Sequence, residues 1–211
     1  MSPSEELKRG SEQLGISLSA KVQIKLLDYL ALLHRWNKFY NLTAVRNSQQ
    51  MVSNHLLDSL AVMPHLWPGR WLDVGCGAGL PGLVLAISKP EWHFSLVDSN
   101  SKKTSFVQQA IIELGIANAI VHCVRVEDWH PADIFDGIIS RAFAELGGFI
   151  RSTRHLAAPH GRWAAMKGAP EQELADVPTG CRVEKVIPIQ VPGLNAARSL
   201  VIATCKESEA T

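Results

Sequence analysis

Several residue types and patterns are scarce in this sequence, and each scarcity argues against a class of protein. The 211 residues include only four cysteines, at positions 76, 123, 181 and 205, with no C-x-x-C pair and no flanking pair of histidines. That spacing argues against a disulfide framework and against a zinc site. The cysteines are therefore predicted to be free thiols in a reducing compartment, and no bound metal is expected.

Long apolar runs and a bulk excess of charge are also missing. The first ten residues, M-S-P-S-E-E-L-K-R-G, hold no apolar signal core, and no later run approaches the length of a membrane span. We therefore expect a cytoplasmic protein with no membrane partner. The 21 basic and 20 acidic residues give a net charge of only +1. A nucleic-acid partner would thus need a local basic patch rather than a bulk excess of positive charge.

The pattern of apolar residues predicts two parts. Residues 1–65 show helical periodicity and form a predicted helical N-terminal extension packed on the core. Residues 66–207 alternate apolar strands with helices, which is typical of a parallel sheet covered on both faces. The predicted strands of that sheet are 70–75, 93–98, 119–124, 135–140 and 161–167, and two further strands, 182–191 and 198–205, are expected to form an antiparallel C-terminal hairpin.

A strand, a glycine turn and a helix are predicted within residues 70–82, R-W-L-D-V-G-C-G-A-G-L-P-G. The turn fits two templates. One is the dinucleotide pattern G-x-G-x-x-G, which runs from Gly77 to Gly82. The other is the acid followed by three glycines that is seen in S-adenosylmethionine enzymes, here Asp73 with Gly75, Gly77 and Gly79. A carboxylate at the strand end suits a cationic ligand better than a pyrophosphate, although Asp73 could instead cap the turn.

The tail of the sheet also separates the two templates. An antiparallel strand near the end of a doubly wound sheet is a methyltransferase feature, whereas an NAD enzyme of this size is expected to carry a Tyr-x-x-x-Lys pair or a substrate domain. Neither is visible in the sequence. The predicted fold is therefore α/β, a Rossmann-like class I S-adenosylmethionine methyltransferase sheet, mostly parallel, with the helical N-terminal extension.

Polar residues at the ends of the later strands are candidates for the same site. Asp98 ends the second strand, where an acid bonds ribose hydroxyls in both nucleotide families; alternatively it is the N-cap of the next helix. Val126 and Glu127 follow the third strand and could read an adenine edge. Arg141 ends the fourth strand and points into the ligand crevice, unless it pairs with a structural acid such as Asp136.

Residues of the helical part are harder to interpret from sequence. His55 and Asp58 are three apart and share a helix face, which favours a local packing contact over catalysis. Asn41 and Thr43 precede that helix and could bind a ligand or cap the backbone. Lys102 and Lys103 could neutralise a phosphate of an RNA substrate or simply face solvent.

The residues, taken in order, resemble one family. The segments W-N-K-F-Y-N-L-T-A-V-R, H-L-L-D-S-L, L-D-V-G-C-G-A-G-L-P-G-L, V-R-V-E-D-W, F-D-G-I-I-S-R-A-F-A and M-K-G closely resemble RsmG, the small-subunit rRNA methyltransferase G, once called glucose-inhibited division protein B. The resemblance spans residues 26–201. The combination is far more specific than the glycine loop alone. One departure is Cys76, where relatives commonly have Ser or Thr.

This resemblance implies a bacterial cytoplasmic enzyme that methylates N7 of a guanine in 16S rRNA, in the rRNA or the small ribosomal subunit, with S-adenosylmethionine. No catalytic general base is expected, and Arg141 is a candidate for positioning the target guanine. We also expect a monomer. The cofactor-binding candidates, from the glycine loop and the family pattern together, are Gly75, Gly77, Gly79, Leu80, Asp98, Val126, Glu127 and Arg141. The substrate-RNA candidates are Asn41, Arg46, His55, Lys167 and Arg198.

Other functions remain open at this stage. The enzyme could methylate a small molecule or a protein, in which case binding would show almost no dependence on salt, unlike phosphate binding. The chain could also be a non-catalytic nucleotide-binding module that senses the cofactor and binds a partner. A Rossmann protein of the NAD type is a third alternative, which titration with NADH and S-adenosylhomocysteine would separate from the others.

Overall fold

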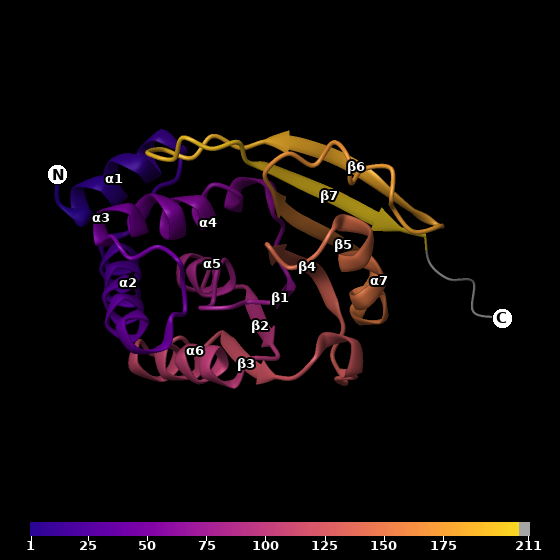
Figure 1. Cartoon of the computed structure of the whole chain (residues 1–211), viewed down its shortest axis with the longest axis horizontal. Helices are drawn as coiled ribbons and strands as arrows, with labels where there is room; N and C mark the ends of the chain where they lie inside the picture. The colour runs from indigo at the N-terminus through magenta and orange to yellow at the C-terminus, as the bar shows by residue number, and fades with distance from the viewer. Residues whose placement is uncertain (207–211) are drawn as a thin grey trace.

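A single seven-stranded sheet organises the molecule. The computed structural model describes residues 1–206 (Figure 1), so residue 207, the last of the predicted second part, lies outside the described residues. The strand order is β3-β2-β1-β4-β5-β7-β6. The strands β1 to β5 are parallel, and β7 runs antiparallel to both β5 and β6. The predicted sheet and its antiparallel C-terminal hairpin are confirmed.

The strand bounds agree with the predicted ones to within a few residues. The greatest difference is at β5, which begins four residues earlier than expected and contains a positive-φ residue, His160. The strands are β1 Arg70–Val74, β2 His93–Asp98, β3 Ala119–Cys123, β4 Phe135–Arg141, β5 Ala157–Lys167, β6 Cys181–Pro188 and β7 Ser199–Cys205.

Helices cover both faces of the sheet, as the predicted alternation requires. Successive residues of a strand point to opposite faces, and in β1 Trp71 packs into one hydrophobic cluster while Leu72 packs into the other. The first cluster includes residues of α1, α2, α5 and α6, and the second includes residues of α7. These helices are α1 Pro3–Gln13, α2 Ala20–Tyr40, α5 Gly82–Ser88, α6 Ser101–Glu113 and α7 Leu146–Thr153.

The N-terminal helices share a hydrophobic core with the sheet. Leu26 of α2 and Leu56 are fully buried in the same cluster as Phe106 of α6. Within the predicted helical extension, residues 48–60 form one composite helix of three segments: α3 Ser48–Met51, a π-helix over Val52–Leu57, and α4 Asp58–Leu60. A π-helix inside a longer helix often marks a functional site.

The connection between β6 and β7 returns to these helices (Figure 1). Ile189 and Val191 are buried in the shared core cluster, and a Cβ on Gly193 would lie 3.3 Å from the side chain of Ser53. The last hairpin therefore packs against the first helices of the chain, which lie at the opposite end of the sequence.

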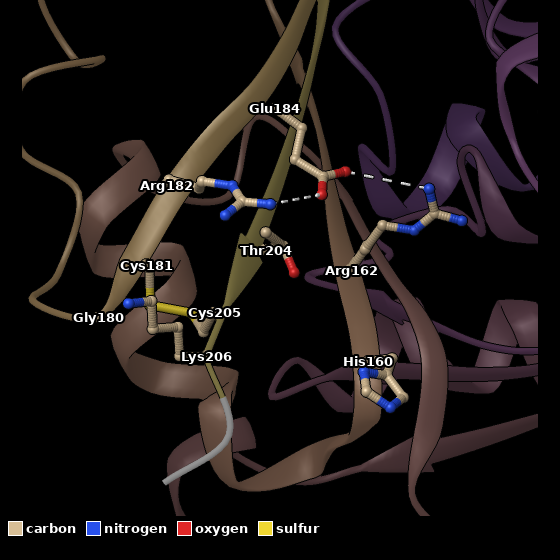
Figure 2. A pocket seen from close by; sticks show the side chains of 9 residues that line it. All are labelled: His160, Arg162, Gly180, Cys181, Arg182, Glu184, Thr204, Cys205 and Lys206. Atoms are coloured by element: carbon tan, nitrogen blue, oxygen red, sulfur yellow. Dashed lines mark ion pairs between the residues drawn. A yellow bond between two sulfur atoms is a disulfide. The ribbon is translucent and has the colours of Figure 1, made fainter.

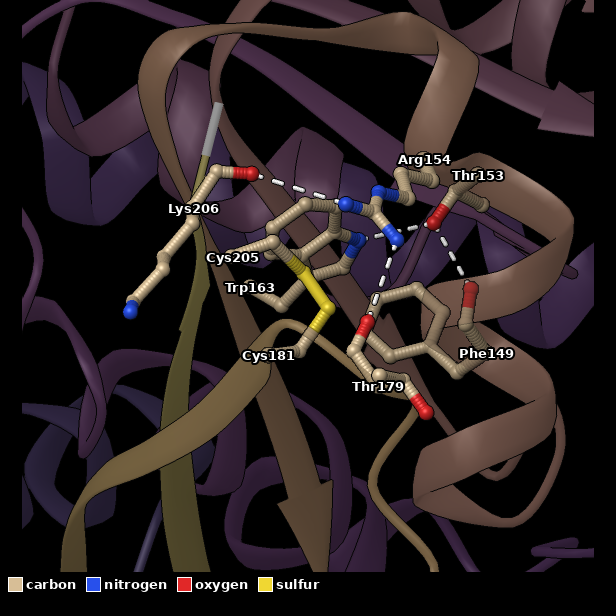
Figure 3. Close-up of a disulfide and its surroundings, with 8 residues drawn as sticks. All are labelled: Phe149, Thr153, Arg154, Trp163, Thr179, Cys181, Cys205 and Lys206. Atoms are coloured by element: carbon tan, nitrogen blue, oxygen red, sulfur yellow. Dashed lines mark hydrogen bonds between the residues drawn. A yellow bond between two sulfur atoms is a disulfide. The ribbon is translucent and has the colours of Figure 1, made fainter. Parts of the chain in front are cut away.

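The prediction that all four cysteines are free thiols was wrong for two of them. Cys181 and Cys205 form a disulfide at the outer edge of the sheet (Figure 3). The pairing follows from the register, because Cys181 of β6 lies directly opposite Cys205 of β7. Spacing alone cannot tell which two of the four cysteines pair, because that depends on the strand register. Cys76 and Cys123 are free.

Candidate functional site

Two adjoining cavities lie at the carboxyl ends of the parallel strands, where open α/β sheets bind ligands. Their volumes are about 540 and 250 Å³, and they share Gly75, Lys103 and Ala142. The larger cavity is also lined by Leu42, Thr43, Asp58, Cys76, Gly77, Ala78, Leu80, Arg141, Met166, Lys167, Gly168 and Arg198. The smaller one is also lined by Val74, Val97, Asp98, Ser99, Val124, Arg125, Val126, Glu127 and Phe143.

The glycine loop between β1 and α5 forms the floor where the two cavities meet. Gly75 has φ +66°, and a Cβ there would come within 2.6 Å of the Phe143 ring, so the position requires glycine. Tyr29 of α2 supports the loop from below, since its buried hydroxyl donates a hydrogen bond of 2.7 Å to the carbonyl of Ala78. Gly79 lines neither cavity; its φ is +88°, and a Cβ there would lie 2.7 Å from the side chain of Leu83, so the turn itself requires glycine at this position.

Asp73 is buried beneath the loop and lines neither cavity. Its Oδ2 accepts a hydrogen bond of 2.7 Å from the backbone N–H of Gly82, at the start of α5, and its Oδ1 has no hydrogen-bond partner within residues 1–206. Burial raises the pKa of Asp73 to about 7. The interpretation of Asp73 as a residue facing a cationic ligand is therefore wrong, and the alternative of a turn-capping aspartate describes this geometry.

Asp98 joins the glycine loop to the smaller cavity. Its Oδ2 accepts a hydrogen bond of 2.9 Å from the N–H of Gly77, and its Oδ1 accepts one of 2.8 Å from Asn100. The N-cap of α6 is Asn100 rather than Asp98, which removes the alternative considered for Asp98. A carboxylate has about four acceptor sites, so Asp98 can accept further bonds from a ligand.

The third strand leads into the other wall of the smaller cavity. Val126 begins a short 3₁₀ turn that includes Glu127, and both line the cavity together with Gly75 and Phe143. Val126 is almost fully buried. The structure thus brings Gly75, Asp98, Val126 and Glu127 together, as the candidate set requires, although they come from three different strand ends.

Arg141 reaches the larger cavity and is paired with Asp58, not with Asp136. Its Nη1 donates hydrogen bonds of 2.9 Å to Asp58 Oδ2 and 3.0 Å to the carbonyl of Asn54. Arg198 holds the other oxygen, with 3.0 Å between its Nε and Asp58 Oδ1. The side chain of Asp58 is only 1% exposed. One buried carboxylate therefore orients two cationic side chains at the cavity wall.

His55 lies in the π-helix and does not reach the surface. Its Nε2 is 3.1 Å from the hydroxyl of Thr43, and its Nδ1 is buried with no hydrogen-bond partner within the described residues. Burial, together with the charge of Arg141, lowers the pKa of His55 to about 4. The prediction that His55 is an RNA contact disagrees with this burial, because the ring packs inside the protein and is neutral near pH 7.

The other RNA candidates lie in two places. Asn41 ends α2 in the left-handed conformation, and its Oδ1 accepts a hydrogen bond of 3.3 Å from Arg46; both side chains are exposed and lie outside the two cavities. Lys167 and Arg198 line the larger cavity. Lys167 is paired with Glu173 at 2.6 Å and is largely buried.

Sequence reasoning missed several residues of the site. Met166 and Leu42 line the larger cavity but look like ordinary core residues in the sequence. Ala142 has φ +56°, which is uncommon for a residue with a Cβ and occurs at functional sites. The signal for Ala142 was its place directly after Arg141 at a strand end.

A third cavity lies elsewhere, between the outer strands of the sheet, and it is larger than the two at the glycine loop. It measures about 730 Å³ and includes Arg162, Arg182, Glu184 and both disulfide cysteines in its lining (Figure 2). Because this cavity is at the amino end of β5 and has no glycine turn, it is not the nucleotide site. Within residues 1–206 no cluster of three or more His, Cys, Asp or Glu is placed to hold a metal ion. No helix in that range is long and apolar enough to cross a bilayer.

Solved structures that share this fold include methyltransferases. A glycopeptide N-methyltransferase solved with S-adenosylmethionine aligns with a TM-score of 0.63 and 11% sequence identity, covering 72% of this chain and 88% of that one. TrmN from Thermus thermophilus aligns with a TM-score of 0.56 and 18% identity, over 80% of this chain and 53% of that one. The fold is that of the class I S-adenosylmethionine-dependent methyltransferases.

Sequence comparison identifies the family. The family profile described as rRNA small subunit methyltransferase G matches residues 22–201. A ribosomal RNA small subunit methyltransferase G from Laribacter hongkongensis is 51% identical over 202 residues, covering 95% of this chain and 98% of that protein. One from Pseudomonas aeruginosa is 51% identical over 203 residues, covering 95% of each. The chain belongs to the rRNA small subunit methyltransferase G family, and the resemblance found in the sequence is confirmed.

Proposed function

We propose that this protein transfers the methyl group of S-adenosylmethionine to N7 of a guanine in 16S rRNA, in the cytoplasm and as a monomer. The observation that carries the proposal is the pair of adjoining cavities at the glycine loop of a chain in this family. The smaller cavity suits a nucleoside, and the larger one is wide enough for a nucleobase beside it. Cations line the larger cavity, which suits a polyanionic substrate.

The residues of the smaller cavity and the loop fit the cofactor. The backbone at Gly75 leaves a cradle that a Cβ would fill, Asp98 presents a carboxylate suited to ribose hydroxyls, and Val126 with Glu127 offers an apolar surface and an acceptor for an adenine. Gly77 and Leu80 line the adjoining cavity, where the amino-acid portion would bind. When bound, the cofactor supplies an electrophilic methyl group on a sulfonium.

The chain's contribution to the reaction is positioning rather than proton transfer. Guanine N7 carries a lone pair in the ring plane and no proton, so no general base is needed. The candidates for such a base are unsuitable in any case. His55 lies outside the two cavity linings, and both oxygens of Asp58 accept hydrogen bonds from arginines. Alignment of the reacting groups with exclusion of water can lower a barrier by about 7–11 kcal/mol in favourable cases.

Arg141 is the residue best placed to orient the target base. It lines the larger cavity, and its guanidinium carries more N–H donors than the two bonds to Asp58 and Asn54 use. A free donor can bond the O6 acceptor of guanine, which lies on the same edge as N7. Lys103 lines both cavities and forms no ion pair within the described residues, so it is available to a phosphate. Arg46, held by Asn41, is an exposed cation close in sequence to Leu42 and Thr43 of the cavity lining and is a further candidate for a phosphate contact.

The test is transfer of a radiolabelled methyl group to small ribosomal subunits from a strain that lacks the enzyme, followed by mapping of the modified base. We expect one labelled guanine at N7, and subunits from the wild-type strain, whose site is already methylated, serve as the control. Cofactor binding without transfer to rRNA or subunits would contradict the proposal and favour a non-catalytic module. A salt-independent KM would favour a small-molecule substrate.

The absence of a general base has its own test. Single-turnover rates at saturating cofactor and subunits should vary little between pH 6 and 8. A rate that rises tenfold per pH unit through one ionisation, and that loses this dependence in His55→Gln or Asp58→Asn, would show a proton transfer in the chemical step.

A further inference from the structure

The disulfide opens onto the cavity of about 730 Å³ between the outer strands. Cys181 and Cys205 are both partly exposed, and Figure 2 shows their sulfur–sulfur bond at the cavity wall, with Arg182 above it and Lys206 directly after it. Cys205 also lines a second cavity of about 380 Å³, on the side of Arg154. Cys205 is thus a partly exposed residue in the lining of both cavities.

Cations dominate the lining of the larger of these two cavities. Arg162, Arg182 and Lys206 line it together with a single carboxylate, Glu184, and this leaves an excess of two positive charges; the remaining titratable group is His160. The two arginines share Glu184 only loosely, with N–O distances of 4.0 and 3.8 Å (Figure 2). A small anion in this cavity therefore meets a positive field beside a disulfide.

A disulfide in a protein of this family needs a chemical explanation. An enzyme that acts on ribosomal RNA works in a reducing compartment, where disulfides are transient and serve catalysis or redox sensing. This step alone rests on the proposed function. The thiols that hold such a compartment reducing are small, and the peptide thiols among them are anionic.

We propose that the Cys181–Cys205 pair is a modification site for an anionic low-molecular-weight thiol of the glutathione class, and that the cavity of Arg162, Arg182 and Lys206 binds its carboxylates. The thiolate of the small molecule attacks Sγ of Cys205. A bond forms between these two sulfurs, the Cys181–Cys205 bond breaks, and its electron pair leaves on Sγ of Cys181 as a thiolate. This exchange gives a mixed disulfide without net oxidation.

A second thiolate completes the reaction. It attacks the small-molecule sulfur of the mixed disulfide, which releases Cys205 as a thiolate and forms the symmetric disulfide of the small thiol. Two electrons thus pass from two small thiols to the protein pair, which then takes up protons. The reverse sequence, with the symmetric disulfide as oxidant, restores the Cys181–Cys205 bond.

The experiment uses the full-length protein with Cys123→Ala, which removes the one exposed free cysteine. The disulfide is formed with oxidised glutathione. Its reduction is then followed by alkylation and mass spectrometry, with glutathione and with the neutral thiol 2-mercaptoethanol in parallel at low salt. The measured quantity is the ratio of the two rate constants, which cancels differences in the accessibility of the disulfide.

Removal of two cations should lower that ratio. In Arg162→Gln/Arg182→Gln we expect the ratio to fall by about threefold to tenfold, the low end of electrostatic rate effects. The rate for 2-mercaptoethanol should fall less, because its attacking thiolate carries one negative charge and that of glutathione carries a net charge of minus two. Glu184→Gln should raise the ratio, since it removes the only carboxylate of the lining. Arg35→Gln, at an exposed paired arginine on α2, is the matched control and should leave the ratio unchanged.

Three results would overturn the proposal. One is an equal ratio in wild type, Arg162→Gln/Arg182→Gln and Glu184→Gln. Another is the absence of any Cys181–Cys205 bond after equilibration with oxidised glutathione, with Cys181→Ala as the mass reference. The third is a mixed disulfide that never accumulates when Cys181→Ala is treated with oxidised glutathione. In that variant the Cys205 thiolate attacks oxidised glutathione and releases one glutathione thiolate, and the adduct should persist because the second protein thiol is gone. All three readouts are independent of methyl transfer.

Discussion

The buried carboxylate of Asp58 should stabilise the fold as well as the site, and Asp58→Ala tests this. The substitution removes two charge-assisted hydrogen bonds, of 2.9 and 3.0 Å, and leaves Arg141 and Arg198 without their acidic partner. Breaking a fully buried ion pair costs about 3–5 kcal/mol. The arginine side chains are 25% and 32% exposed, so water compensates part of the loss, and we expect a destabilisation of about 2–3 kcal/mol.

The assay is urea unfolding, with the slope checked so that the midpoint reports stability alone. Asp133→Ala is the matched control, because Asp133 makes an exposed ion pair with Arg70 and its removal should cost less than about 1 kcal/mol. Asp58→Asn keeps the shape and one acceptor oxygen and should fall between the two. If Asp58→Ala and Asp133→Ala unfold at the same urea concentration, the buried carboxylate does not stabilise the fold and the reasoning fails.

Three further outcomes are expected. Asp98→Ala should weaken cofactor binding by about 1.5–3 kcal/mol, the scale of a lost hydrogen bond to a charged group, with an almost unchanged melting temperature; unchanged affinity in calorimetric titration would remove Asp98 from the site. Arg141→Ala should abolish methyl transfer while lowering stability much less, and full turnover per folded molecule in a strongly destabilised variant would show the arginine to be structural. The third outcome concerns pH. Because the pKa of Asp73 is raised, the stability that its protonated form contributes is lost as pH rises from about 4 to 7. Because the pKa of His55 is lowered, the stability that its neutral form contributes is lost as pH falls from 6.5 to about 4. These two dependences on pH oppose each other. Between pH 4 and 6.5, the stability of Asp73→Asn should therefore rise more steeply with pH than that of the wild type, and the stability of His55→Gln should fall as pH rises. Urea midpoints that change with pH identically in the wild type and both variants would contradict both assignments.

The sheet could be predicted from sequence because its signals are local. Each parallel strand is a short apolar run between helical segments, and the glycine turn after β1 leaves little choice of conformation. The burial of the Asp73 carboxylate could also have been predicted, although the sequence was interpreted as placing it beside the ligand. Residues 71 and 73 share a strand face, and Trp71 packs into the cluster that contains α5, so the alternation that buries the ring also buries the carboxylate.

The wall of the larger cavity could not be predicted, because its contacts join distant parts of the chain. Asp58 meets Arg141 and Arg198 across sequence separations of 83 and 140 residues, and no local pattern encodes such a pairing. The π-helix that holds His55 also has no signature in the sequence. The disulfide depended on the register of β6 against β7, and a shift of one residue would have moved the cysteines apart.

The long span between Asp58 and Arg198 bears on how the protein is made. Chains emerge from the ribosome with the amino end first, so the helix that carries Asp58 is complete long before β7 exists. Until Arg198 and the strand after it are synthesised, that carboxylate has only one of its two arginines, and the connection that covers the first helices is missing. A nascent chain of this protein is therefore expected to lack a finished cavity until Arg198 and the strand that follows it have been synthesised and have folded.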